Sequence, residues 1–328
     1  MLQGETTTSS QSQSSAYNGS AVQHESDSVT SQPRSWRTTI KDYVTLTKPR
    51  IISLLLLTTL VPMLLAYEGP FSLQLLSLIF WTMVGGTLAA GGSGAINMFF
   101  DRDVDAIMSR TRKRPIPNDR VRAHHALLFG LVLNVLAFLV LYWAANLLAA
   151  VLAMIGTAYY VLIYTCWLKR TTTQNIVIGG AAGAIPPLVG WAAVAGNLSV
   201  EPFLLFAIIF YWTPPHFWAL ALLRRTEYAR AGIPMLPVVH GEAETKWQIL
   251  LYTLLLIALT VVLTPLGFAG PVYLALALLL GGIFLRDAYQ LFREPGTTSA
   301  WKLYKYSLLY LALLFGAMIV DHVVMQLI

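Results

Sequence analysis

Cysteine is nearly absent from this 328-residue sequence, and charged residues are scarce. The single cysteine, Cys166, permits no internal disulfide and no CxxC metal site. Because its neighbours are aromatic and apolar, we expect it to be a small buried residue. Charged residues make up 12% of the chain, about half the usual fraction in soluble domains, and 56% of the residues are hydrophobic. These values exclude an ordinary soluble domain.

Several sequence signatures are also missing. The chain has no P-loop, HExxH, GxSxG or dinucleotide fingerprint. Its first residues are rich in Ser, Thr and Gln, have no apolar run, and contain no Lys or Arg before Arg34. We therefore expect residues 1–35 to be a disordered tail that is neither a signal peptide nor a mitochondrial presequence. This favours a bacterial inner (plasma) membrane.

Long apolar blocks dominate the rest of the chain. Each is close to the ~20 residues that cross a bilayer as a helix, and a helix satisfies its own backbone hydrogen bonds in lipid. We predict an all-α, polytopic membrane domain over residues 36–328 with about nine transmembrane helices. The predicted spans are 51–67, 73–98, 125–144, 147–168, 175–195, 202–223, 247–267, 270–286 and 305–326.

Lysine and arginine alternate with the spans. Five of the 22 lie before the first predicted span. The others lie on every second connector or at the span ends next to that connector, in groups of seven, two, four and four. Because positive residues stay on the cytoplasmic side, we predict a cytoplasmic N-terminus and, with nine spans, a periplasmic C-terminus. This orientation explains the net charge of +6, so no nucleic-acid partner is expected.

The connector after the second span carries an acidic motif. Asn97, Asp101 and Asp105 are spaced by four residues and share one face if the segment is helical. Two carboxylates and an amide suit Mg²⁺, which shares its coordination sphere with substrate phosphates. A basic run that can neutralise a diphosphate follows: Arg112, Lys113 and Arg114. The alternatives are a solvated loop that caps a helix and a basic run that only fixes topology.

The sixth span contains Pro214-Pro215, which we expect to break or kink it. The next residue, His216, is either a hydrogen bonder between helices or a proton donor or haem ligand. Glu227 ends this span, and we expect it to face the first acidic cluster. The small-residue stretch at 85–95 has two open interpretations, close helix packing and space for a lipid-like substrate.

The acidic motif and the basic run resemble the first acidic motif of intramembrane aromatic prenyltransferases. Four other stretches, at 46–50, 174–183, 213–220 and 231–237, are similar to the protohaem IX farnesyltransferase (haem O synthase) family. The similarity covers about residues 38–325. It implies a nine-helix fold with a central cavity that opens to the cytoplasmic side.

The resemblance also implies a reaction. A farnesyl group would pass from farnesyl diphosphate to the 2-vinyl group of haem B, giving haem O and diphosphate during the biogenesis of haem-copper oxidases. Mg²⁺ would be the cofactor and haem B a substrate. The implied partners are these substrates, membrane lipids, and haem A synthase or oxidase assembly factors.

Family roles carry over to matching positions. Asn97, Asp101 and Asp105 are expected to bind the metal and to be catalytic, together with His216. The second acidic site departs from the family pattern, because Glu227 stands before Tyr228 where aspartate is common. The expected diphosphate-binding residues are Arg112, Lys113, Arg114, Lys169 and Arg170.

Three other interpretations remain. A quinone or chlorophyll prenyltransferase would share the acidic motif but not the 213–220 and 231–237 stretches. A transporter for a cation or haem suits many spans with intramembrane prolines, although no inverted repeat is visible. An assembly scaffold for an oxidase would not need the acidic residues.

Overall fold

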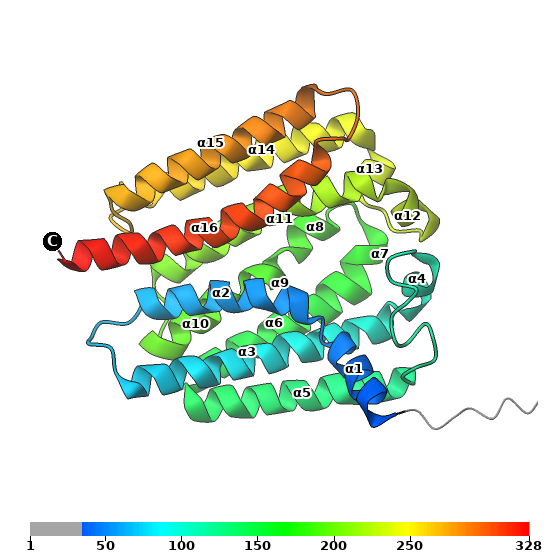
Figure 1. Cartoon of the computed structure of the whole chain (residues 1–328), viewed down its shortest axis with the longest axis horizontal. Helices are drawn as coiled ribbons and strands as arrows, with labels where there is room; N and C mark the ends of the chain where they lie inside the picture. The colour runs from blue at the N-terminus through cyan, green and yellow to red at the C-terminus, as the bar shows by residue number, and fades with distance from the viewer. Residues whose placement is uncertain (1–34, 328) are drawn as a thin grey trace, which may run out of the picture. The chain divides into compact units, whose positions relative to one another are not determined.

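The computed structural model describes residues 35–327, and every regular element in that range is helical (Figure 1). The expected disordered tail lies outside the described residues, apart from Ser35. Eight helical segments are long and apolar enough to cross a membrane. A ninth candidate is the pair α1 and α2, which is bent by 48° at its break. The prediction of an all-α bundle with about nine spans is confirmed.

The helices that build the spans differ in continuity. Two spans consist of several short pieces, α6–η1–α7 and α8–α9–α10, where η1 is a π-helix. The elements are α2 Pro49–Leu65, α3 Leu73–Phe100, α5 Ala123–Ala144, α6 Leu147–Ala158, η1 Tyr159–Leu168, α7 Lys169–Thr171, α8 Asn175–Gly179, α9 Ala181–Ala184, α10 Pro186–Ala195, α11 Val200–Leu223, α14 Gly241–Val262, α15 Pro271–Arg293 and α16 Ala300–Leu327. The shorter elements outside these spans are α1 Trp36–Leu46, α4 Arg102–Ile107, α12 Arg225–Arg230 and α13 Leu236–Val239.

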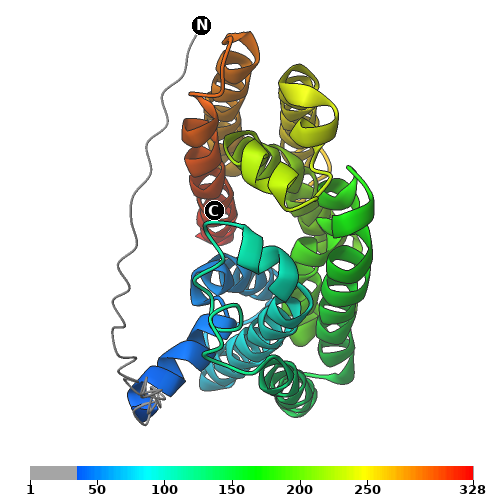
Figure 2. The same ribbon diagram turned by 90° about the vertical axis from the view of Figure 1, so that its right-hand side faces the viewer.

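Helices that follow one another in the chain also pack together in the bundle. In the first half, α2 contacts α3, α3 contacts α5, and α5 contacts α6. In the second half, α11 contacts α14, α14 contacts α15, and α15 contacts α16. The last span returns to the first, because α16 packs against α2. The view along the helices in Figure 2 shows the resulting arrangement. Two hollows, on α3 and between α14 and α15, lie away from the middle, so the central cavity stays a prediction.

The tightest helix pair, α3 and α5, depends on glycine. A Cβ atom on Gly130 of α5 would lie 2.7 Å from the Gly92 carbonyl oxygen of α3 and 2.6 Å from Ile96 Cγ1. A Cβ on Gly92 would in turn lie 2.7 Å from the Gly130 carbonyl oxygen. Close backbone approach at small residues is a main source of helix association in lipid. The small-residue stretch of α3 therefore serves packing.

The two Pro-Pro pairs have different structural effects. Pro186-Pro187 stands in the first turn of α10, where a missing N–H costs little, and the part of the same span before it is divided into α8 and α9. The helix α11, by contrast, continues through Pro214 and Pro215 to Leu223. Of the predicted break or kink, the break is therefore wrong, and the kink stays a prediction. Packing of α11 against α14 and α16 holds the segment helical despite the lost hydrogen bonds.

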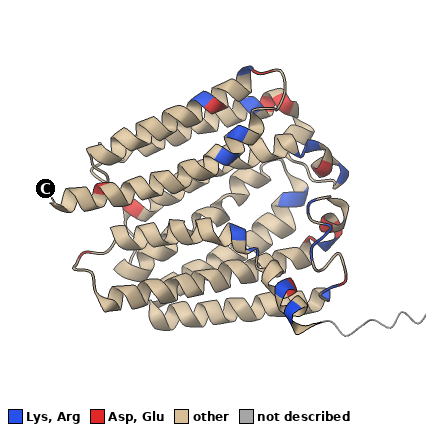
Figure 3. Cartoon of the chain, viewed as in Figure 1, with Lys and Arg blue, Asp and Glu red and all other residues tan. Residues whose placement is uncertain are grey.

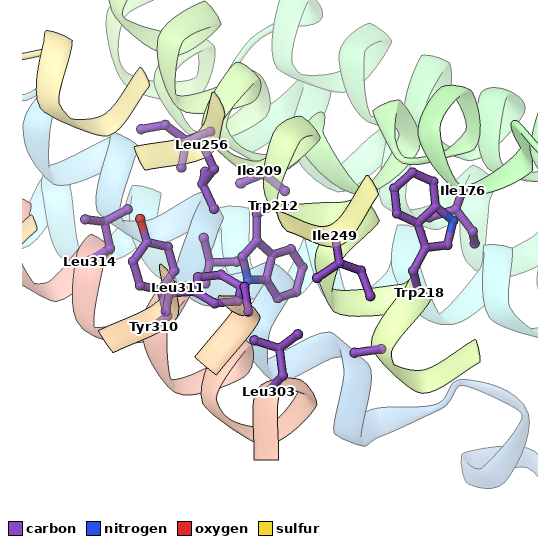
Figure 4. Packing of buried hydrophobic residues seen from close by; sticks show 14 of the residues in the cluster. Ile176, Ile209, Trp212, Trp218, Ile249, Leu256, Leu303, Tyr310, Leu311 and Leu314 are labelled. Carbon is purple, nitrogen blue, oxygen red and sulfur yellow. The ribbon is translucent and has the colours of Figure 1, made fainter. Parts of the chain in front are cut away.

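The largest apolar core lies where α11, α14, α15 and α16 meet. Trp212 of α11 and Tyr310 and Leu314 of α16 pack there (Figure 4). The Trp212 indole also donates a 2.8 Å hydrogen bond to the Ser307 carbonyl, which joins α11 to α16.

Cys166 is exposed on η1, so its expected burial is wrong. In a membrane protein an apolar sequence does not imply an inward-facing residue, because the outer surface meets lipid.

Charged residues gather at one end of the bundle (Figure 3). The connections between α3 and α5 and between α11 and α14 lie there and carry ten of the 21 described lysines and arginines. We call this the basic end. The segregation of basic residues along the sequence thus becomes a segregation in space, as the topology prediction requires.

Candidate functional site

The three residues of the acidic motif lie together at the basic end. Asn97 is in the last turn of α3, Asp101 follows this helix, and Asp105 is in α4. The Asp101 amide donates to the Asn97 carbonyl at 2.9 Å, and the Asp105 amide donates to the Asp101 carbonyl at 2.7 Å. This i to i−4 pattern keeps the helical phase across the α3–α4 junction. The three side chains therefore share a face, and all are buried.

Each buried carboxylate has a basic partner, from another span for Asp101 and from the same connection for Asp105. Lys169 Nζ lies 2.5 Å from Asp101 Oδ2, and Arg114 Nη1 lies 2.6 Å from Asp105 Oδ2. The Asn97 amide also donates to Asp101 Oδ2 at 2.7 Å. Buried charges need such partners, because an isolated one is costly to desolvate. Lys169 and Arg114 thus belong to the same cluster as the acidic motif.

Lys48 is a site residue that sequence reasoning missed. Its Nζ donates to Asn97 Oδ1 at 2.5 Å and lies 3.5 Å from the Tyr160 hydroxyl. The residue occupies the break between α1 and α2 with a left-handed φ of 56°, directly before Pro49. The only sequence signal was the 46–50 stretch, which was similar to the family but had no assigned role.

The π-helix η1 supplies the neutral side of the cluster. Thr165 accepts a 3.0 Å hydrogen bond from the Asn97 amide and donates to the Tyr160 carbonyl at 2.8 Å. Tyr160 stacks on Tyr164, with ring centroids 5.6 Å apart. π-Helical turns are often found at functional sites. We call the set Lys48, Asn97, Asp101, Asp105, Arg114, Tyr160, Thr165 and Lys169 the buried polar cluster.

The remaining basic residues lie at the rim. Arg170 forms a bidentate pair with Asp103, with both N···O distances 2.7 Å. Its hydrogen bonds lower the pKa of Asp103 to about 2. Arg112 and Lys113 have exposed side chains on the connection between α4 and α5. The structure therefore brings Arg114, Lys169 and Arg170 to the acidic motif and leaves Arg112 and Lys113 exposed near it.

The second acidic position lies on α12, beside the loop that follows α4. Burial would raise the pKa of Glu227, but hydrogen bonds from Ser109 and Arg224 outweigh burial and lower it. The Arg224 guanidinium lies 2.9 Å from the Glu227 carboxylate. The neighbouring Tyr228 has its pKa raised by burial. Because Ser109 follows the acidic motif by four residues, this contact joins Glu227 to the loop behind the motif. That Glu227 faces the first acidic cluster stays a prediction.

His216 is buried between α11 and α16. Its Nδ1 lies 2.6 Å from the Ser307 hydroxyl, and its ring stacks between Trp212 and Tyr304 with centroid distances of 4.4 and 4.7 Å. His216 therefore bridges two helices, which was one of the two interpretations open from the sequence. Among the described residues, no hydrogen bond or ion pair links it to the buried polar cluster. A role in haem chemistry stays a prediction.

The donor set of the buried polar cluster fits a hard divalent cation. It offers two carboxylates and one amide oxygen, and Asp101 Oδ1 is buried without a hydrogen bond. Residues 35–327 contain no group of three or more His, Cys, Asp or Glu that could hold a metal. A metal here would therefore need ligands from water or a bound phosphate, which is how Mg²⁺ is usually bound.

Fold and site together define an all-helical, multi-pass membrane protein with an acid–base cluster at one end. The sequence matches the UbiA prenyltransferase family over residues 55–314. The chain belongs to this family.

Curated relatives share more than half of their aligned residues with this chain. It is 58% identical over 285 residues to a protoheme IX farnesyltransferase of Roseiflexus sp. (strain RS-1), covering 87% of this chain and 53% of the relative. It is 55% identical to a protein of the same name from Trichodesmium erythraeum, covering 86% and 85% of the two chains. The chain spans about half the length of the first three relatives it matches.

Solved structures share the fold at low sequence identity. A digeranylgeranylglyceryl phosphate synthase has a TM-score of 0.71 at 19% identity, covering 87% of this chain and 98% of the other. A UbiA homologue from Archaeoglobus fulgidus, bound to DMAPP and Mg²⁺, has a TM-score of 0.63 at 16% identity, covering 84% and 99%.

Proposed function

We propose that this protein transfers the farnesyl group of farnesyl diphosphate to the 2-vinyl group of haem B. Haem B, farnesyl diphosphate and water would give haem O and diphosphate. The observation that carries the proposal is the buried polar cluster, where two carboxylates and three basic side chains converge at one end of a membrane bundle. The choice of haem as acceptor rests on the curated relatives.

The basic side chains of the cluster suit an anionic leaving group. Three of them, Lys48, Arg114 and Lys169, lie within hydrogen-bond distance of Asn97, Asp101 or Asp105. All three basic side chains already point at the acidic motif. When diphosphate binds, these side chains are placed to donate to its oxygens and to stabilise the charge that develops as the C1–O bond breaks.

Asn97, Asp101 and Asp105 would hold Mg²⁺, as the Archaeoglobus fulgidus homologue binds Mg²⁺ together with DMAPP. The ion would supply Lewis-acid stabilisation of the leaving diphosphate. Within the chain, Lys169 and Arg114 neutralise the two carboxylates at 2.5 and 2.6 Å. They thereby provide the opposite charge that a buried carboxylate needs.

Arg112, Lys113 and Arg170 would extend the diphosphate site at its rim. Glu227 and Tyr228 would form its second acidic side, because Ser109 and Arg224 hold the Glu227 carboxylate in place. His216 would act on the haem side, as an iron ligand or proton donor through Nε2, while Nδ1 remains on Ser307. We place the protein in a bacterial inner membrane with the basic end cytoplasmic. Haem A synthase or oxidase assembly factors are the proposed partners.

The test is an in vitro assay on the full chain in detergent. Haem B, farnesyl diphosphate and Mg²⁺ are added, and the products are analysed by mass spectrometry. We expect a haem heavier by one farnesyl group plus water, and we expect EDTA to abolish its formation. If a folded sample leaves haem unchanged but prenylates a quinone, the assignment of haem B as the acceptor is wrong. If no acceptor is prenylated, the proposed transferase reaction is wrong.

A further inference from the structure

An open groove lies between α14 and α15, on a part of the bundle that the proposed reaction does not use. Its volume is about 540 Å³, which lies within the ~300–1,000 Å³ range of small-molecule sites. Its walls are apolar except at two positions on α15. The lining residues are Leu250, Leu254, Gly282, Leu285, Arg286 and Tyr289.

Gly282 opens this groove. A Cβ atom built on Gly282 would have no other atom within 4 Å, so the glycine is not needed for helix packing. Gly282, Leu285, Arg286 and Tyr289 follow one another at i, i+3, i+4 and i+7 and line one face of α15. Leu250 and Leu254, four residues apart, form the opposite wall on α14. The groove therefore runs along the helices, in the direction that a lipid chain takes in a membrane.

Arg286 is an exposed charge inside a transmembrane helix. Among the described residues it has no hydrogen bond or ion pair. The neighbouring Asp287 is buried and pairs with Lys302 at 2.8 Å, so it is not available to Arg286. An arginine near the end of a transmembrane segment extends toward the interface, where lipid phosphates lie. Since no side chain of the described residues pairs with Arg286, its guanidinium can take an anion from outside the chain.

Aromatic residues fix the depth of the groove. Trp247 of α14 and Phe292 of α15 pack with ring centroids 5.9 Å apart, one turn beyond Leu250 and Tyr289 toward the basic end. Both are exposed on the outer surface, and Trp is enriched at the membrane–water interface. Arg286 and Tyr289 therefore lie just below the headgroup level, and the leucines lie deeper.

We propose that this groove binds an anionic phospholipid of the leaflet at the basic end. One acyl chain would lie along Leu250, Leu254, Gly282 and Leu285. The phosphate would accept hydrogen bonds from the Arg286 guanidinium and the Tyr289 hydroxyl. Attraction between juxtamembrane basic residues and anionic lipid is a known source of lipid selectivity. This site goes beyond the proposed transferase function and does not depend on it.

The test is native mass spectrometry of the full chain, titrated with phosphatidylglycerol or phosphatidylcholine in detergent. Gly282→Leu fills the groove, and Gly316→Leu is its control, since Gly316 on α16 also has open space in front of its Cα. Arg286→Gln removes the charge, and Arg293→Gln is its control, because Arg293 is exposed on the same helix outside the groove.

We expect phosphatidylglycerol to bind more tightly than phosphatidylcholine to the unaltered chain. Arg286→Gln should weaken phosphatidylglycerol binding about tenfold, the effect of losing one charge-assisted contact. Gly282→Leu should weaken binding of both lipids, and the two controls should leave binding unchanged. The proposal is overturned if Arg286→Gln and Arg293→Gln bind phosphatidylglycerol equally, or if Gly282→Leu abolishes a dimer of the chain and leaves lipid binding intact.

Discussion

Lys48 shows how one residue can connect the N-terminal helix to the candidate site. It stands between α1 and α2, and its side chain reaches Asn97 on α3 and Tyr160 on η1. The following Pro49 occupies the first turn of α2 and fixes where that helix starts. Four helical elements thus meet at one lysine side chain, which lies beside two buried carboxylates.

Replacing Lys48 by methionine keeps most of its length and removes its charge. We expect Lys48→Met to lower kcat/KM for farnesyl diphosphate by about 10–100-fold, because a hydrogen bond to a charged group contributes roughly 1.5–3 kcal/mol. The control is Lys41→Met, since Lys41 is exposed on α1. Equal kinetics for the two variants would remove Lys48 from the diphosphate site.

The Asp103–Arg170 pair predicts a defined pH dependence. The pKa of Asp103 is about 2 in the folded protein and about 3.9 in an unfolded chain. A depressed folded pKa gives stability that is fully present above the unfolded pKa and is lost as the pH falls toward 2. The Tm difference between the unaltered protein and Asp103→Asn should therefore be constant from pH 8 to 5 and shrink below pH 4.

Thermal unfolding in detergent across this pH range measures the difference. Because the Asp103 side chain is 60% exposed, the difference should be small, at most about 1 kcal/mol. A Tm difference that grows on acidification would contradict the assignment of this pair.

At the scale of helices, the α3–α5 contact positions the acidic motif. The two backbones meet at Gly92 of α3 and Gly130 of α5. Gly92 precedes Asn97 by five residues on the same helix. On its other side α5 is joined to α6, because Asn134 accepts a 2.9 Å hydrogen bond from Thr157. A shift of α3 would therefore move Asn97 and Asp101 relative to Lys169, which is carried by a different span.

Gly130→Ala tests this contact. Its new Cβ would overlap Ile96 and the Gly92 carbonyl, so we expect a loss of about 1–3 kcal/mol in stability, as for other overpacked sites. Gly316→Ala is the control, because its Cβ has open space and alanine favours the helix. Thermal unfolding in detergent should show a lower Tm for Gly130→Ala alone. A Tm equal to that of the control would mean that α3 and α5 separate easily.

Helices and their order were accessible from the sequence, because bilayer thickness and backbone hydrogen bonding leave few alternatives to apolar helices. The four-residue spacing from Asn97 to Asp105 was also sufficient to predict a shared face. Sequence rules that consider only neighbouring residues failed where contacts between distant helices determine the structure. Pro214-Pro215 does not interrupt α11, Cys166 faces outward, and the approach of Lys48 to Asn97 joins residues 49 positions apart.

At the scale of the whole molecule, the number of spans determines on which sides the termini lie. With nine spans the two ends would lie on opposite sides, and we propose that the basic end is the cytoplasmic one. We expect a C-terminal alkaline phosphatase fusion to be active in a bacterial host and a C-terminal GFP fusion to be dark. A fluorescent C-terminal GFP would show an even number of spans or the reverse orientation.

The most direct measurement of the central claim compares two aspartates on one connector. Haem O formation from haem B and farnesyl diphosphate is followed by mass spectrometry for Asp105→Asn and for Asp119→Asn, with both proteins matched in Tm and assayed at the same saturating Mg²⁺ concentration. Asp105 is buried and pairs with Arg114. Asp119 is exposed, and its backbone φ of 51° is one that asparagine tolerates. The account predicts a loss of at least about 100-fold for Asp105→Asn and near-normal turnover for Asp119→Asn. Near-normal turnover of Asp105→Asn at saturating Mg²⁺ would contradict it.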